Sequence, residues 1–189
     1  MKEDTDQQLV DRVRKGNNQA FNLLVLRYQH RVAALISRFI SDPHEVEDVS
    51  QEAFIKAYRA LSSFRGESAF YTWLYRIAVN TAKNHLVSRS RRPPATDVEI
   101  EDSETNEVAA PLREHETPEG RLAAEELRQA IDAAIEELPE ELKTAFTLRE
   151  FSGLSYEDIT EVMDCPVGTV RSRIFRAREA IDKKIRELI

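Results

Sequence analysis

The 189-residue sequence is short of the residues that build extracellular, membrane-spanning or turn-rich proteins. It has one cysteine, Cys165, so no disulfide can form within the chain, which fits a reducing compartment. Its 5 glycines and 7 prolines suit helices better than a turn-rich β fold. No run of about 18 apolar residues could span a membrane, and the charged start MKEDTDQQ is unlike a signal peptide. We therefore expect a soluble, cytoplasmic protein.

The sequence also lacks the patterns of catalytic and metal sites. Its four histidines, His30, His44, His85 and His115, are dispersed and show no ligand spacing with the cysteine. There is no glycine-rich phosphate loop and no recognisable pair of nucleophile and base. We expect no enzyme activity, no cofactor and no metal, and we expect Cys165 to be a small, buried packing residue.

The charges are segregated along the chain. The net charge of −7 taken alone argues against a nucleic-acid partner. Residues 70–92, however, contain five basic residues and no acidic one, and residues 165–189 are also basic, whereas residues 93–141 are strongly acidic. Because attraction to phosphate is screened within about 10 Å at ordinary salt, local charge matters more than the total. A merely solvated basic face is the alternative at this point.

Apolar residues recur at helical spacing in both halves, and no alternating strand pattern of useful length is present. The first half predicts helices at 9–16, 18–40, 43–61 and from residue 70, the third beginning with the cap Asp42-Pro43. Residues 93–117 are acidic, contain prolines and show no apolar period, which predicts a flexible linker. Helices then resume at 118–138, 141–151, 155–165 and from 166 or 169 almost to the end. The sequence predicts an all-α protein with two small helical domains, residues 1–92 and 118–189, on this linker.

The stretch SYEDITEVMDCPVGTVRSRIFRAREAI has the layout of a helix-turn-helix, with a short helix, a tight turn and a longer basic helix. On a helical wheel one face of the second helix is apolar, formed by Val170, Ile174, Ala177 and Ile181. The opposite face carries Ser172, Phe175, Arg176 and Glu179, with Arg171 and Arg173 on its flanks. An outward phenylalanine beside arginine suits DNA, where a ring can contact a thymine methyl and arginine can pair with guanine. A basic solvated helix and a protein-docking helix are the alternatives.

The stretch FYTWLYRIAVNTAKN, residues 70–84, combines aromatic and basic residues on one helix. Its core face should hold Phe70, Leu74, Ile77 and Thr81, with Trp73 at the edge. A second face carries Tyr71, Tyr75 and Ala82, and a third carries Arg76, Asn80 and Lys83. One buried face needs no second aromatic row. We therefore expect the second and third faces to handle a ligand outside the domain.

Two long stretches resemble the extracytoplasmic-function sigma factors of bacterial RNA polymerase, most closely the sigma-E type. They are DVSQEAFIKAYRALSSFRGESAFYTWLYRIAVNTAKN and LPEELKTAFTLREFSGLSYEDITEVMDCPVGTVRSRIFRAREAI. The resemblance extends over about residues 8–185 and is weak only in the linker and at the ends. It implies two conserved helical domains, called sigma-2 and sigma-4. It also implies a sigma factor that recruits core polymerase to promoters, in an envelope stress response under anti-sigma control.

The resemblance also implies roles for individual residues. Core polymerase should dock through its β′ clamp helices on Asp48, Gln51 and Glu52. Ser50 stands where many relatives carry alanine or an apolar residue. The −10 element should be bound and melted by Lys56, Phe64, Arg65, Ser68, Ala69, Tyr75, Arg76, Asn80 and Lys83, where the loop residues 64, 65, 68 and 69 form the pocket for a flipped base. The −35 element should be read in the major groove by Arg171, Ser172, Phe175 and Arg176, and its phosphates should be contacted by Arg149, Tyr156 and Thr169.

The partners implied are core RNA polymerase (β′ clamp helices and β flap), promoter DNA and a membrane-anchored anti-sigma factor, which could hold the protein at the inner membrane face. No small-molecule substrate is implied, and we expect the free chain to be a monomer. The acidic linker is either a solvated tether or an imitation of nucleic acid inside the polymerase. A stand-alone helix-turn-helix repressor or activator is the main rival hypothesis, but it does not need the aromatic and basic residues between Phe64 and Asn84.

Overall fold

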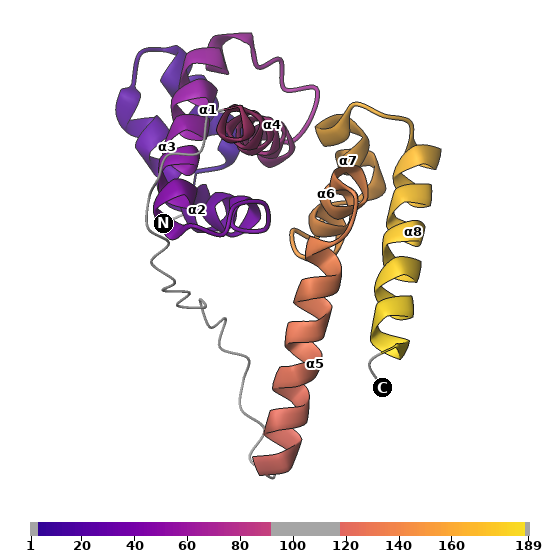
Figure 1. Ribbon diagram of the computed structural model, residues 1–189. Helices are drawn as coiled ribbons and strands as arrows, with labels where there is room; N and C mark the ends of the chain where they lie inside the picture. Colours follow the sequence, from indigo (N-terminus) through magenta and orange to yellow (C-terminus); the bar gives the residue numbers. More distant parts are fainter. Residues whose placement is uncertain (1–3, 92–117, 188–189) are drawn as a thin grey trace.

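The computed structural model describes residues 4–91 and 118–187, and all regular elements in those ranges are helical (Figure 1). The first part contains α1 (Asp6–Arg14), α2 (Asn18–Ile36), α3 (Pro43–Ala60), the 3-10 turn η1 (Leu61–Ser63) and α4 (Phe70–Ser90). The second part contains α5 (Pro118–Glu136), α6 (Glu140–Glu150), α7 (Tyr156–Met163) and α8 (Val167–Arg186). The all-α prediction is confirmed. The predicted linker lies outside the described residues.

Polar side chains determine where several helices begin. At α3 the Asp42 carboxylate accepts hydrogen bonds from the backbone N–H groups of His44 and Glu45, as the sequence predicts. At α7 the Ser155 hydroxyl accepts from the backbone N–H of Asp158 at 3.0 Å, and the Asp158 carboxylate accepts from the backbone N–H of Ser155 at 3.3 Å. Such reciprocal caps satisfy N–H groups that the first turn of a helix leaves unpaired.

The core of the first domain is built around α4, which packs against α2 and α3. Phe70, Leu74 and Ala78 of α4 are buried together with residues of α2 and α3, including Leu24 and Phe54. This packing also positions the loop before α4. The ring of Phe64 in that loop packs against the rings of Phe70 and Trp73, with centroid distances of 6.0 and 5.0 Å.

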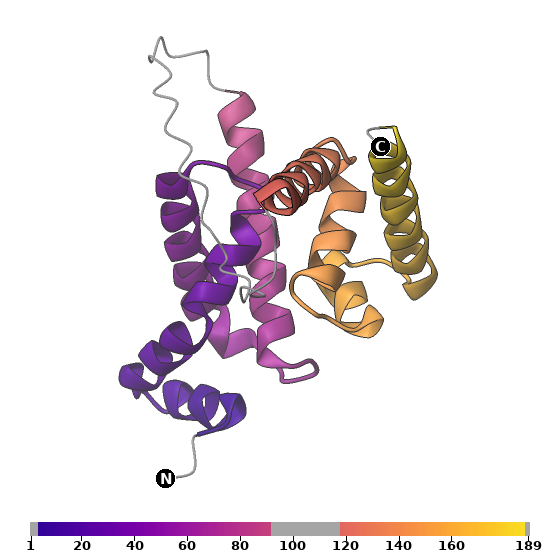
Figure 2. The same ribbon diagram turned by 90° about the horizontal axis from the view of Figure 1, so that it is seen from below.

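The second domain packs onto the first through α7. Figures 1 and 2 both show α7 beside α4, with α8 on the side of the molecule away from α4. Ile159 and Val162 of α7 belong to the same buried cluster as Leu74 and Val79 of α4. A second cluster joins α5 to α8 farther along. The two helical domains therefore share a packed interface in addition to the linker.

This interface changes the predicted faces of α4. Phe70 and Leu74 lie in the core as predicted, at 4% and 0% exposure. The prediction that Tyr71, Tyr75 and Ala82 line a face away from the core is wrong for Tyr75 and Ala82, which are 4% and 0% exposed. The reason is that α4 has α2 and α3 on one side and α7 on another, so more than one stripe of it is buried.

Candidate nucleic-acid interface

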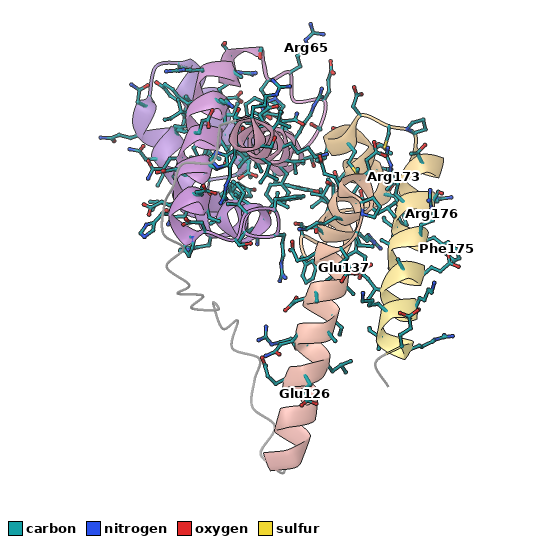
Figure 3. All side chains as sticks on the ribbon, viewed as in Figure 1. Arg65, Glu126, Glu137, Arg173, Phe175 and Arg176 are labelled. Carbon is teal, nitrogen blue, oxygen red and sulfur yellow. The ribbon has the colours of Figure 1, made fainter. Side chains whose placement is uncertain are left out.

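The outer face of α8 is the most exposed candidate surface. Phe175 is 67% exposed although it is a large apolar residue, and Ser172 and Arg176 beside it are also exposed. Figure 3 shows Phe175 and Arg176 pointing away from the other helices of the domain. The opposite face of α8 is buried, as predicted, through Val170, Ile174, Ala177 and Ile181. The helix thus presents an aromatic ring and a guanidinium group to solvent with no packing role for either.

The turn between α7 and α8 is tight. Asp164 adopts the left-handed conformation with φ 50°, which ends α7, and Pro166 is the N-cap of α8. Cys165 between them is half-buried, in place of the buried packing residue that we expected. Its sulfur accepts a hydrogen bond from Arg173 Nη1 at 3.3 Å, and Arg173 also forms an ion pair with Glu141. Arg173 therefore braces the turn and is directed inward (Figure 3).

The residues predicted to contact −35 phosphates, Arg149, Tyr156 and Thr169, lie at the end of α6 and in the first turns of α7 and α8. The Arg149 guanidinium group stacks over the Tyr156 ring at 4.8 Å from its centroid, and that of Arg171 lies 5.6 Å from the same ring. Arg149 also donates a hydrogen bond to the carbonyl oxygen of Leu154 at 2.7 Å. Cation–π contacts of this kind hold both positive charges beside one ring. Thr169 is half-buried in the first turn of α8.

The basic row predicted on α4 is present. Arg76 and Asn80 are exposed, one turn apart on the same face. Lys83, the next residue of the row, is half-buried, and its Nζ atom lies 2.9 Å from Glu140 of α6. Lys56 on α3 forms an ion pair with Glu52 at 2.8 Å. One end of the row is therefore open and the other is covered by the second domain.

The loop before α4 forms one wall of a cleft of about 820 Å³. Arg65, Ser68 and Arg76 line this wall, with the ring of Phe64 below them. Phe64 is only 4% exposed and packs against Trp73 at a ring-centroid distance of 5.0 Å. The other wall belongs to the second domain, as described below. Of the predicted pocket residues, Phe64, Arg65 and Ser68 line this cleft and Ala69 does not, while Tyr75 of α4 also lies outside the lining.

Two further residues of this loop, Ala69 and Arg65, are exposed to solvent. Ala69 is exposed at the N-cap of α4, and Arg65 extends from the tip of the loop into solvent (Figure 3). The indole of Trp73 lines the cleft, although the sequence suggested only an edge of the core for it. A wheel could not reveal this, because the loop that covers Trp73 determines which part of its ring stays open.

The predicted polymerase-docking residues Asp48, Gln51 and Glu52 are exposed on the outer face of α3. Ile55, one turn farther on the same face, is 49% exposed. The sequence did not single out Ile55, although the i, i+3, i+4, i+7 spacing places it beside the acidic residues.

Sequence reasoning missed the polar contact between the two domains. The Asp158 carboxylate accepts hydrogen bonds from the hydroxyls of Thr72, at 2.9 Å, and Tyr71, at 3.2 Å. Burial raises the pKa of Asp158, but hydrogen bonds from Ser155, Thr72 and Tyr71 lower it more, so its pKa lies below the ordinary value. The pKa of Tyr71 is raised by its own burial and by the charge of Asp158. The carboxylate is therefore ionised at neutral pH and bonded to both domains.

A second missed contact lies at the end of α2. The Arg38 guanidinium group lies 3.9 Å from the centroid of the Phe151 ring and 3.6 Å from the Asp132 carboxylate. Both of those partners belong to the second domain. No local pattern could indicate this contact, because it depends on how α7 sits on α4.

Within residues 4–91 and 118–187 we find no group of three histidine, cysteine or acidic side chains that could hold a metal ion. No helix in these ranges is long and apolar enough to cross a membrane. The candidate sites are thus surfaces and one cleft, with basic, aromatic and amide side chains.

Both halves of the chain match family models. Residues 24–92 match sigma-70 region 2, and residues 128–181 match sigma-70 region 4. These matches define the class, a transcription initiation factor of the sigma-70 family with the helical domains described above. They exclude the stand-alone helix-turn-helix hypothesis, because region 2 makes up most of the first domain.

Curated relatives narrow the class. The chain is 64% identical to the ECF RNA polymerase sigma-E factor of Escherichia coli strain K12 over 185 residues, which are 98% of this chain and 96% of the relative. It is 62% identical to the RNA polymerase sigma-H factor of Pseudomonas aeruginosa over 187 residues, 99% of this chain and 97% of the relative. The chain belongs to the extracytoplasmic-function sigma factors of the sigma-E type, which direct RNA polymerase to specific promoters.

Two solved structures of nearly full length share the fold. CnrH in complex with the cytosolic domain of CnrY is 25% identical, with a TM-score of 0.68 over 95% of this chain and 96% of that chain. The Bartonella quintana sigma factor RpoE, in complex with the anti-sigma factor NepR, is 22% identical, with a TM-score of 0.63 over 88% of this chain and 96% of that chain. An engineered region 2 of sigmaE in complex with GTAAAA is 64% identical over 49% of this chain and 97% of that chain, with a TM-score of 0.46.

Proposed function

We propose that this sigma factor reads promoters through two separate surfaces, one on each domain. The observation that carries the proposal is the exposed Phe175–Arg176 pair on α8, an aromatic and a basic residue with no packing role in the protein. The exposed Arg76–Asn80 row on α4 supplies the second surface. Each pair combines side chains that contact DNA bases or phosphates well.

The −35 surface is the outer face of α8. A recognition helix in the major groove contacts base edges with the residues that face away from its own domain. Arg176 would pair with a guanine and Phe175 would contact a thymine methyl, with Ser172 between them. Arg171, in the first turns of the same helix, would read the groove with them. Arg149, Tyr156 and Thr169 would contact phosphates, and the stacking of the Arg149 guanidinium group on the Tyr156 ring supports a shared role for these two.

The −10 surface is the loop at 62–69 together with the exposed row of α4. A base flipped out of the duplex needs a pocket, and the cleft lined by Arg65 and Ser68, together with the rings of Phe64 and Trp73, would receive it. Ala69 is next to this lining in the sequence but is not part of it. Arg76, Asn80, Lys83 and Lys56 would hold the strand. Tyr75 is 4% exposed and lies outside the cleft lining, so it has no role in stacking in this conformation.

Other parts of the molecule would bind proteins. The exposed α3 face with Asp48, Gln51 and Glu52 would dock on the β′ clamp helices of core polymerase, and the second domain on the β flap. The relative CnrH is described in complex with the cytosolic domain of CnrY, so we propose that a membrane-anchored anti-sigma protein restrains this chain too. The protein would act in the cytoplasm, respond to envelope stress and carry out no catalysis itself.

The test is transcription reconstituted from core polymerase, the chain and promoters of the sigma-E type. We expect Asn80→Ala to impair DNA opening more than formation of the closed complex, because its amide lies on the exposed row that would hold the melted strand. Permanganate footprinting measures opening, and a gel shift at low temperature measures the closed complex. Asn22→Ala, an exposed amide on α2 outside this row, is the matched control. Footprints of Asn80→Ala equal to those of the wild type would contradict the role.

A further inference from the structure

The −10 surface and the second domain face each other across the domain interface. In the cleft next to the loop, Arg65 and Arg76 of the first domain lie opposite Glu161 and Asp164 of the second. A neighbouring cleft of about 430 Å³ continues along α4 and has Arg76, Asn80 and Lys83 on one wall and Glu141 and Asp164 among the residues on the other. The predicted strand-binding residues thus look onto carboxylates of α6, α7 and the turn after α7.

Direct contacts fix this arrangement at several points. Lys83 forms its ion pair with Glu140 at 2.9 Å. The Asp158 carboxylate accepts hydrogen bonds from Thr72 and Tyr71 of α4, where Thr72 is only 1% exposed. Because Thr72 is buried under α7, its hydroxyl loses this partner only if α7 moves away.

The acidic side chains of the second domain place negative charges where a bound strand would place its phosphates. A nucleic-acid strand would bring phosphate anions to Arg76 and Lys83, and the acidic side chains of the second domain bring carboxylates to the same residues. Carboxylates and phosphates compete for the same guanidinium and ammonium donors. The outer face of α8, in contrast, points away from the interface and remains exposed.

We propose that the acidic face of α6 and α7, formed by Glu140, Glu141, Asp158, Glu161 and Asp164, is a built-in competitor of the −10 strand. In the free chain this face occupies the −10 surface, and α7 must leave α4 before a strand can bind there. The inference rests on the proposed role of α4 in binding the −10 element. It adds that another part of the same chain covers this surface. The hydrogen bond from Thr72 to Asp158, which we call the latch, holds that part in place.

The test uses the full-length free chain and a fluorescein-labelled single-stranded oligonucleotide carrying GTAAAA, with an oligo-dC strand of equal length as the non-specific control. Thr72→Val removes the hydroxyl that donates a hydrogen bond to Asp158, and it keeps a β-branched side chain of similar size. Loss of a hydrogen bond to a charged group should shift the balance toward the open form by about 10- to 150-fold. We expect tighter binding of the GTAAAA strand, by up to that factor, and a larger radius of gyration in X-ray scattering.

Thr147→Val is the matched control. Thr147 is 0% exposed in α6, and its hydroxyl finds no hydrogen-bond partner within the described residues, so the same substitution there removes no contact between domains. We expect its strand binding and radius of gyration to match the wild type. A second, independent pair of variants uses charge: Arg38→Glu should open the chain, and Arg38→Glu combined with Asp132→Arg should close it again.

The direction of the effect decides the question. If Thr72 itself held the strand, Thr72→Val would weaken binding, and unchanged or weaker binding would overturn the proposal. The wild-type chain is assayed in parallel for transcription with core polymerase. Wild-type transcription together with no gain for Thr72→Val would refute the proposed competitor but leave the proposed promoter-binding function standing. Failure of the wild-type chain to start transcription from its promoter would refute the proposed function itself.

Discussion

Replacing Arg176 by alanine should weaken recognition of the −35 element without changing the stability of the fold. Arg176 is exposed, and the buried stripe of the helix is made by other residues, such as Val170 and Ile174. Its removal therefore opens no cavity and leaves no buried group unpaired. The free energy of unfolding should change by no more than about 0.5 kcal/mol.

The expected loss is in recognition of the −35 element. A bidentate pair between arginine and guanine discriminates against the wrong base by about 1–3 kcal/mol, which is about 5- to 150-fold in an equilibrium constant. Arg176→Ala should lower transcription from the best −35 site by a factor in this range. It should affect promoters already mutated at the contacted base pair much less, because the contact is absent there.

The assay is run-off transcription from promoters in which each −35 base pair is changed in turn. Arg178→Ala is the control: Arg178 lies on the same helix, and its guanidinium group forms an ion pair with Glu150 at 2.5 Å. That variant should weaken all promoters about equally if it acts at all, because it changes only the general attraction to phosphate. An equal fall of Arg176→Ala activity on matched and mutated −35 sites would refute the base-reading role.

Two further predictions concern stability. Leu148→Ala, in α6 at 0% exposure, should lower the free energy of unfolding by about 2–5 kcal/mol, measured by urea denaturation, and an unchanged midpoint would contradict the packing. Asp158 has a lowered pKa, so its stabilisation is fully present above the ordinary pKa of 3.8 and is lost as the pH falls through the folded-state value. The stability difference between wild type and Asp158→Asn should hence be constant between about pH 5 and 8 and shrink only in acid; a change near neutral pH would show that another group controls the contact.

The faces of α8 could be predicted from the sequence because they depend on one helix alone. A stripe of Val170, Ile174 and Ala177 at three- and four-residue steps must be buried in any soluble helix, and this fixes which residues are left outside. The caps at Asp42 and Ser155 are equally local, because their partners lie two or three residues away. Local periodicity and capping thus sufficed for the helix order and for the candidate −35 surface.

The surface of α4 could not be predicted in the same way. Tyr75 looked like a spare aromatic because a wheel allows for one buried side, whereas α4 is covered by α2 and α3 and also by α7. Asp158 caps α7 together with Ser155, and its carboxylate also accepts hydrogen bonds from Tyr71 and Thr72, more than eighty residues earlier in the chain. The residue pattern within one segment cannot indicate a hydrogen-bond partner that lies so far away in the sequence.

The domain contact also gives a physical reason for the acidity of the second domain. Acidic residues near a DNA-binding helix weaken its attraction to phosphate, so their presence there calls for a separate explanation. Here Glu140, Glu161 and Asp164 lie on the side that faces α4, whereas Arg176 lies on the outer face of α8. The second domain thus has a basic outer face, which we propose binds DNA, and an acidic face directed at the first domain. The outer face of α8 is already exposed. An event that pulls α7 from α4 would therefore uncover the proposed −10 surface without altering the proposed −35 surface, and both would then be accessible.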